Sequence, residues 1–162
     1  MGLWAWLTKP RTTKLMADAP APRVVVKTVG VPREATARRR ADLHVNKLHI
    51  VDLRSLEARR FRIVGSTYVC SERDRKVYGG TQYLLVREPD NRVDGNAVAV
   101  YGKGRHLGYT STTKAAGLAP LLDRLGADAY LVNGAAATDA SIKLWADLPT
   151  LPGLRAHVAA TS

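Results

Sequence analysis

The sequence has one cysteine, Cys70, and no hydrophobic run long enough to span a membrane. A single cysteine excludes an internal disulfide framework and a multi-cysteine zinc site. We interpret Cys70 as a buried structural thiol, because no reactive motif surrounds it. The first residues, MGLWAWLTKPR, have a short apolar patch but neither a preceding basic region nor a small-residue cleavage site, so they make a poor signal peptide. We therefore expect a cytoplasmic protein, one that can associate with the nucleoid, and no membrane partner.

Residue patterns typical of catalysis and of metal binding are also missing. The four histidines lie near no Ser, Cys or acidic motif typical of a catalytic triad, and no glycine-rich loop is suited to cradle a phosphate. Asp90 and Asp94 stand at positions 1 and 5 of a calcium-loop template, but position 3 is Arg92 and position 12 is Tyr101, where carboxylates are needed. We predict a protein that is not an enzyme and that uses neither a metal nor a cofactor.

Acidic residues are few, and the positive charge is unevenly distributed. The net charge is +11; residues 1–63 hold 14 Lys and Arg against 5 Asp and Glu, whereas residues 64–162 hold 11 against 9. Such an asymmetry is typical of proteins that contact a polyanion, of which nucleic acid is the commonest in the cytoplasm. A solvated, soluble tail is the alternative, because no aromatic residues interleave with the basic runs to form a stacking groove.

Composition shifts divide the chain into three parts. Residues 1–59 contain several prolines and the basic excess, and we interpret them as a basic, partly disordered N-terminal extension or linker. The apolar pattern between Leu43 and Leu56 fits neither the strand nor the helix period, so the pattern does not decide whether this segment adds a strand to the core. Residues 60–152 form the predicted domain, and residues 153–162 a C-terminal tail.

Within the predicted domain, alternating apolar runs separated by turn residues indicate strands. Between the fourth and fifth runs, TTKAAGLAPLLDRLG predicts two short helices, with Pro120 opening the second and Gly126 closing it. The predicted fold class is mainly β, a small OB-like or SH3-like six-stranded β-barrel with one or two short helices. The six runs are FRIVGSTYVC, TQYLLVRE, NAVAVY, RHLGYT, DAYLVNG and SIKLWADL.

The second and third predicted strands are joined by a long acidic turn. A hairpin needs only two residues such as Asn-Gly, but this turn contains five carboxylate or amide side chains. Asn and Asp side chains bond to nearby backbone groups and stiffen irregular loops, which explains Asn91 and Asn96. A stiff loop does not need as many acceptors as this turn has. The Asp94 carboxylate is therefore a candidate to accept a hydrogen bond from a ligand hydroxyl.

The same segment resembles a known family. REPDNRVDGNAVAVYGKGRHLGYTS, residues 87–111, preceded by VGSTYV and followed by AAGLAPLL, is similar to the HIRAN domain, and the resemblance covers roughly residues 60–150. The hallmark of that family is an Arg/Glu-Pro-x-Asn-Pro-x-Asp-x-Asn-Ala-Ile/Val-x-Val segment, then Gly-Tyr or Gly-His before a helix. The matching residues are Glu88, Pro89, Asn91, Asp94, Asn96, Ala97, Val98, Val100, Gly108 and Tyr109.

The resemblance implies a module that occurs in certain Swi/Snf-type helicases and as stand-alone bacterial proteins, and that binds single-stranded DNA and captures a free 3′ end. By motif position, Asp94 would accept the terminal 3′-hydroxyl, Tyr68 would stack on a base, and Tyr109 would line the same pocket. Asn91 is the fourth residue assigned to nucleic-acid binding. The implied partners are single-stranded DNA or DNA ends and a helicase or nuclease, and the implied role is in DNA repair or replication.

Three positions depart from the family pattern. Arg92 replaces the usual proline, Val93 stands where an aromatic residue stacks, and Thr67 stands where a basic residue contacts phosphate. The departures at Val93 and Thr67 weaken the expected end capture. They also leave a second interpretation open, a protein-interaction adaptor that keeps the HIRAN fold without binding DNA.

Overall fold

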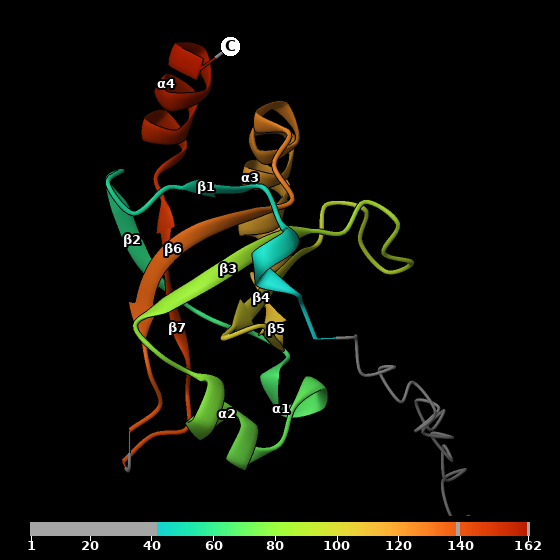
Figure 1. The fold of residues 1–162 in the computed structure, drawn as a ribbon, viewed down its shortest axis with the longest axis vertical. Helices are drawn as coiled ribbons and strands as arrows, with labels where there is room; N and C mark the ends of the chain where they lie inside the picture. The colour runs from blue at the N-terminus through green and yellow to red at the C-terminus, as the bar shows by residue number, and fades with distance from the viewer. Residues whose placement is uncertain (1–41, 139, 162) are drawn as a thin grey trace, which may run out of the picture. The chain divides into compact units, whose positions relative to one another are not determined.

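A seven-stranded sheet organises the described part of the chain (Figure 1). The structure is a computed structural model that describes residues 42–138 and 140–161, all in the second of the two units, Met1–Arg33 and Glu34–Ser162, into which the chain divides. The predicted disorder of the N-terminal segment therefore lies mainly outside the described residues. The antiparallel strand order is β2 (Ala58–Arg62), β7 (Trp145–Pro149), β6 (Ala129–Ala135), β3 (Gln82–Arg87), β4 (Val98–Gly102) and β5 (Arg105–Tyr109).

The sheet curls until its two ends meet. Directly after β2, Val64 exchanges two backbone hydrogen bonds of 2.9 Å with Tyr109, the last residue of β5. A further strand, β1 (Ile50–Asp52), pairs with β6 in parallel outside this path. The predicted mainly β, barrel-like fold is thus confirmed, as a curled sheet with one more strand than expected.

Helices flank the sheet, and one of them corrects a prediction. The 3₁₀ helix η1 (Val45–Lys47) precedes β1, and α3 (Thr112–Leu125) is a single helix with Pro120 inside it, so the predicted division into two helices is wrong. Leu118, Leu121 and Leu122 are buried on both sides of the proline, and this apolar face offsets the hydrogen bond that proline cannot donate. Gly126 caps the helix in the left-handed conformation, as predicted.

The run FRIVGSTYVC, predicted as one strand, is divided between two elements. Its strand portion ends at Arg62, Gly65 adopts a left-handed φ of 71°, and α1 (Ser66–Val69) follows. The positive φ at Gly65 breaks the extended backbone, so Tyr68 lies on a helical turn and not on a strand. The next helix, α2 (Glu72–Tyr78), begins with a reciprocal capping box between Ser71 and Asp74.

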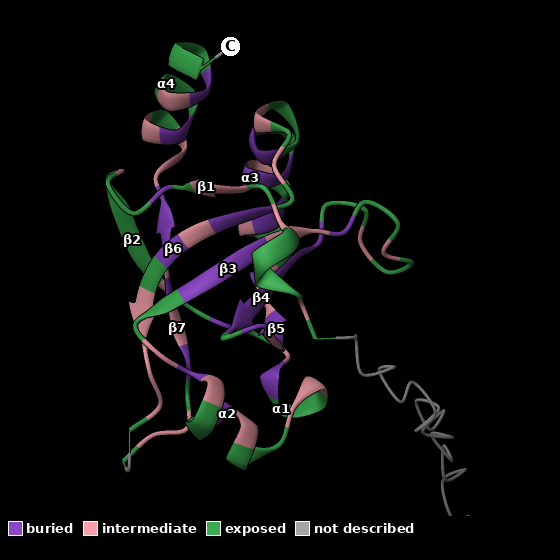
Figure 2. Ribbon diagram, in the orientation of Figure 1, coloured by how far each residue is buried: buried purple, intermediate pink, exposed green. Residues whose placement is uncertain are grey.

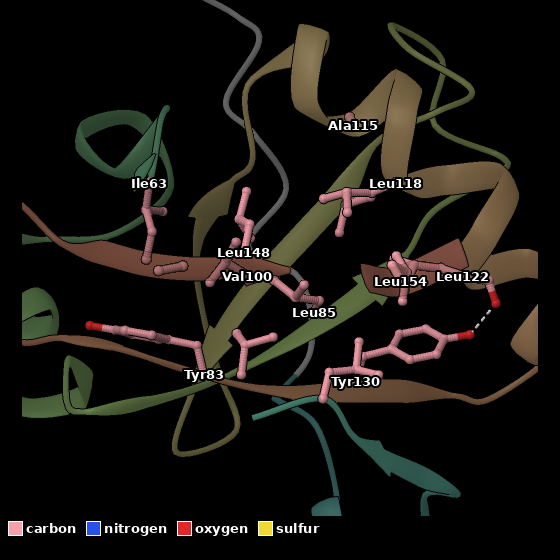
Figure 3. Packing of buried hydrophobic residues seen from close by; sticks show 14 of the residues in the cluster. Ile63, Tyr83, Leu85, Val100, Ala115, Leu118, Leu122, Tyr130, Leu148 and Leu154 are labelled. Atoms are coloured by element: carbon pink, nitrogen blue, oxygen red, sulfur yellow. Dashed lines mark hydrogen bonds between the residues drawn. The ribbon is translucent and has the colours of Figure 1, made fainter. Parts of the chain in front are cut away.

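The core lies between the curled sheet and α3 (Figure 3). Leu118 and Leu122 of the helix share one cluster with sheet residues such as Leu85. Two buried tyrosines keep their hydroxyls bonded: Tyr83 donates to the Ala135 carbonyl at 3.0 Å, and Tyr130 donates to the Leu122 carbonyl. Desolvation by burial raises the pKa of both phenols.

Ordered structure extends beyond both predicted domain boundaries, which were placed before residue 60 and after residue 152. On the N-terminal side, Leu53 follows β1 and is fully buried, and the Leu43 N–H donates to the Gly104 carbonyl at 2.8 Å. On the C-terminal side, α4 (Leu151–Thr161) places Leu154 and Val158 in the core. Three buried aliphatic side chains therefore come from segments assigned to the extension and the tail.

We expect a fragment of residues 58–152 to lack a cooperative unfolding transition. It loses Leu53, Leu154 and Val158, and each buried aliphatic side chain contributes about 2–5 kcal/mol to domains that are stable by only about 5–15 kcal/mol. Urea unfolding followed by circular dichroism measures this, with a fragment of residues 42–162 as the control. A cooperative transition in the fragment of residues 58–152 would contradict the expectation.

Candidate nucleic-acid-binding site

The end of β5 fixes the position of Tyr109. Its backbone is held by Val64, as described above, and its half-buried ring meets the His106 ring edge-on at a centroid distance of 4.9 Å. His106 is buried, with Nε2 3.0 Å from the Gly108 carbonyl oxygen, and its ring lies 5.0 Å from that of Tyr101. The His106 ring thus supports the Tyr109 ring and is itself packed against Tyr101.

Tyr68 lies on the turn next to this tyrosine. α1 starts directly after Gly65, and a methyl group at Gly65 would lie 3.9 Å from the Tyr109 ring. The Tyr68 residue is 86% exposed, so its ring contributes little to the core. An exposed aromatic ring held on a helical turn offers a flat face for stacking, and base stacking needs no sequence-specific hydrogen bond.

The acidic turn between β3 and β4 is braced from its base by Arg87. This guanidinium pairs with Asp123 of α3 at 2.7 and 3.0 Å. It also donates to the carbonyl oxygens of Ala97 at 2.8 Å and Gly95 at 3.2 Å. Arg87 of β3 therefore ties the turn to Asp123 of α3, and the bonded Arg87 side chain is only 10% exposed.

Asn91 stiffens the turn from inside. Its Nδ2 donates to the Glu88 carboxylate at 2.9 Å, and its Oδ1 accepts from the backbone N–H groups of Val93 at 3.0 Å and Asp94 at 3.3 Å. The predicted stiffening role of Asn91 is confirmed. Because the side chain is engaged within the turn, we propose that Asn91 positions Asp94 and does not contact DNA itself.

Asp94 keeps part of its carboxylate available. Oδ1 accepts the Asn96 backbone N–H at 2.8 Å, and within residues 42–138 and 140–161 no protein donor is bonded to Oδ2. The side chain is half-buried, while the neighbouring Val93 is 96% exposed. A rigidly held carboxylate with one oxygen open is suited to accept a hydrogen bond from a hydroxyl.

The predicted residues are brought together in part. The helix of Tyr68 and the strand of Tyr109 approach each other at Gly65. The strand that leaves the acidic turn pairs with the strand of Tyr109. Ala99 is opposite Tyr109, and the Thr110 N–H donates to the Val98 carbonyl at 3.0 Å. The turn itself extends outward from the sheet (Figure 1). Among the described residues, neither tyrosine donates a hydrogen bond to the Asp94 carboxylate.

Exposed cations surround these elements. Arg62 precedes Val64, Arg73 lies on α2, and Arg92 lies on the acidic turn; none of the three has an acidic partner within salt-bridge distance among the residues that the structure describes. Thr67 is exposed beside Tyr68 and brings no charge. Phosphate contacts from this part of the chain would therefore come from the three arginines.

Sequence reasoning missed the residues that support the site. Arg87 and His106 hold the turn and the Tyr109 ring, and buried Glu88 accepts from Asn91. A signal existed for Glu88, which belongs to the matched motif, and for His106, which stands two residues before Gly108. The sequence gave no signal for the bracing role of Arg87, because its partner Asp123 lies 36 residues away in the chain.

Cys70, metal binding and membrane spans were the other features considered in the sequence. Cys70 is half-buried against the core, its thiol donates to the Ser66 carbonyl at 3.3 Å, and burial raises the pKa of this thiol. Over the described ranges, no cluster of three His, Cys, Asp or Glu side chains is placed to hold a metal. None of the helices described is both long and apolar enough for a membrane span.

Comparison with known proteins places the chain. A crystal structure of a protein from Lactobacillus plantarum is 25% identical over 56% of this chain and 90% of that one, with a TM-score of 0.47. The crystal structure of the HIRAN domain of human HLTF is 23% identical over 64% of this chain and 84% of that one, with a TM-score of 0.44. No curated protein matches the sequence. The HIRAN domain family model matches residues 56–148, which are more than half of the chain and include β2 to β7 except the last residue of β7, so this chain belongs to the HIRAN domain family.

Proposed function

We propose that this HIRAN domain is a non-enzymatic module that binds single-stranded DNA at or near a free 3′ end. HIRAN domains are binding modules associated with DNA, and the observation that carries the proposal here is the exposed Tyr68 ring on α1, the helix that packs against the strand of Tyr109. In this proposal Tyr68 stacks on a base, Tyr109 lines the pocket, and Asp94 accepts the 3′-hydroxyl. The three unpaired arginines bind the phosphates. A cytoplasmic role in DNA repair or replication, beside a helicase or nuclease, completes the proposal.

Binding is expected to weaken with salt in proportion to the phosphate contacts. If Arg62, Arg73 and Arg92 each neutralise one phosphate, the slope of log K against log salt is about −2 for single strands, with residues 1–41 able to add to it. Fluorescence anisotropy of a 5′-labelled oligothymidylate between about 50 and 200 mM salt measures the slope.

Replacing Arg62 by glutamine should reduce the steepness of that slope by about 0.7, the contribution of one single-strand phosphate. Arg155→Gln is the matched control, since Arg155 is also exposed but lies on α4. Equal salt slopes for the Arg62 and Arg155 variants would show that Arg62 does not contact a DNA phosphate. A wild-type protein without measurable binding at low salt would refute the DNA-binding function itself.

Removing the Asp94 carboxylate should erase a preference for a 3′-hydroxyl over a 3′-phosphate. The carboxylate repels a terminal phosphate but accepts a hydrogen bond from a terminal hydroxyl. Asp94→Ala should therefore bind both termini alike, while binding of internal segments stays equal or becomes slightly stronger. Competition between oligonucleotides that differ only at the 3′ terminus checks this. Asn96→Ala serves as the control, because its backbone N–H still bonds Asp94.

A wild-type protein that binds all termini equally would show that end recognition is absent. The positions that account for such a loss are Val93 and Thr67, where the family pattern has a stacking aromatic and a cation. The same two departures favour one second candidate, a protein-interaction adaptor on the same fold. If the protein is such an adaptor, the salt titration and the competition between 3′ termini should both show no specific DNA binding.

A further inference from the structure

Strand β2 has one unoccupied edge over most of its length. Among the described strands, β2 pairs only with β7. The bonds from Thr150 N–H to the Glu57 carbonyl (2.8 Å) and from Ile63 N–H to the Leu144 carbonyl (2.9 Å) show which residues of β2 bond to β7. Odd-numbered residues of β2 therefore bond to β7, and even-numbered residues face the other edge. Val64 uses that edge to pair with Tyr109.

The remaining even-numbered residues of β2 are Ala58, Arg60 and Arg62. In the described part of the chain no strand runs along their side of β2, so their N–H and C=O groups are open to a partner. Figure 2 shows β2 exposed along almost its whole length. An open edge of this kind presents alternating donors and acceptors that an extended main chain can match.

A groove of about 480 Å³ lies against β2. Phe61 contributes to it from the strand, Leu118 from α3, and Leu148, Leu151 and Pro152 from β7 and the start of α4. Because successive side chains of a strand alternate, a chain added at the edge of β2 would direct every second side chain toward this groove. The groove therefore offers apolar side-chain sites beside an open backbone edge.

The rim of the groove is basic. Arg59 is exposed with no acidic partner in the described structure, and the Lys114 ammonium lies 4.2 Å from the centroid of the Phe61 ring. The lining includes one acidic side chain, Glu57, which accepts a hydrogen bond from Thr150 at 3.3 Å. Two cations against one carboxylate favour an occupant with negative charge.

We propose that the β2 edge binds an extended acidic peptide segment of another protein, which adds a strand to the sheet and inserts aliphatic side chains into the groove. A second copy of this chain fits poorly, because β2–β2 pairing would bring two arginine-rich strands together. Nucleic acid fits poorly as well, because it lacks the main-chain amide pattern and would meet an apolar wall. Tyr68, Tyr109 and Asp94 do not line this groove, and Arg62 is the one residue that the open edge shares with the proposed phosphate contacts.

The test uses the full-length chain and a defined probe. The probe is a fluorescent peptide with blocked ends in which glutamate alternates with valine and leucine; its control has lysine at each glutamate position. We expect saturable binding of the acidic probe and at least about tenfold weaker binding of the basic one. N-methylation of the alternate amides that face β2 removes their donors, and we expect it to weaken binding by about tenfold or more.

A protein variant tests the same edge from the other side. Arg60→Pro removes one edge-facing N–H without touching a bond to β7, a position where strands tolerate proline. Its matched control, Arg60→Ala, loses the same ion pair with Asp147 but keeps the N–H. We expect the proline variant to bind the acidic probe about fivefold or more weakly than the alanine variant.

Three outcomes would overturn the proposal. One is an acidic probe that fails to bind the full-length protein, or an N-methylated probe that binds as tightly as the parent. A second is displacement of the peptide by oligothymidylate in a protein whose Tyr68 is intact but not in Tyr68→Ala, which would make the groove part of the DNA path. A third is concentration-dependent dimerisation in sedimentation that Arg60→Pro abolishes, which would make a second copy the occupant.

Discussion

Replacing Gly108 by alanine should lower the free energy of unfolding by about 2–6 kcal/mol. Gly108 has a φ of +149°, a backbone conformation that side chains with a Cβ rarely adopt. An alanine methyl would also lie 2.5 Å from the Val64 carbonyl oxygen and 2.8 Å from Cγ2 of Ile63. Backbone atoms on the neighbouring strand cannot move aside without breaking the Val64–Tyr109 pair.

Thermal unfolding followed by circular dichroism measures the effect of Gly108→Ala. The loss of stability corresponds to a fall in Tm of about 10 °C or more for a domain of this size. Gly80→Ala is the matched control, because a methyl at Gly80 meets no atom within 4 Å and its φ is not positive. A Tm for Gly108→Ala equal to that of the control would contradict the geometric argument.

The sequence predicted the elements whose signal is local. Strands β3 and β4 alternate clearly beside turn residues, and both occur close to the predicted residues. The capping box of Ser71 and Asp74 is also a local signal, and it marks the start of α2, for which no helix was predicted. The signal for α2 is therefore present in the local sequence.

Other elements depend on tertiary contacts that no local pattern reveals. β1 has three residues of which none is fully buried, and its parallel pairing with β6 comes from residues far along the chain. α4 buries Leu154 and Val158 against a core assembled from distant strands. Pro120 gave a correct local argument for a helix break, which the packing of α3 overrode.

The candidate site divides in the same way. The stiffening role of Asn91 follows from its own side chain and neighbouring amides, so the sequence was sufficient to predict it. The Tyr109 ring is held by His106 from the same strand, but the brace from Arg87 to Asp123 needed the fold. The family resemblance pointed to Tyr68 and Asp94. In the structure the Tyr68 ring is exposed, and among the described residues Oδ2 of Asp94 accepts no hydrogen bond.

Tyr68→Ala should reduce affinity for single-stranded oligothymidylate by about tenfold or more, because stacking of one base contributes about 1–3 kcal/mol. Its stability should stay within about 0.5 kcal/mol of wild type, since the residue is 86% exposed and no bond of its hydroxyl is part of the core. Anisotropy titration at low salt, with urea unfolding of the same samples, separates the two quantities.

Two matched variants sharpen the Tyr68 experiment. Tyr68→Phe keeps the ring and should retain wild-type affinity within about twofold, because stacking uses the π-face and not the hydroxyl. Val77→Ala removes another exposed apolar side chain, on α2, and should leave binding unchanged. If Tyr68→Ala binds as tightly as Val77→Ala, the stacking surface lies elsewhere. If Tyr68→Phe is as weak as Tyr68→Ala, the hydroxyl carries the interaction, and Tyr68 contacts a phosphate or a base edge in place of a base face.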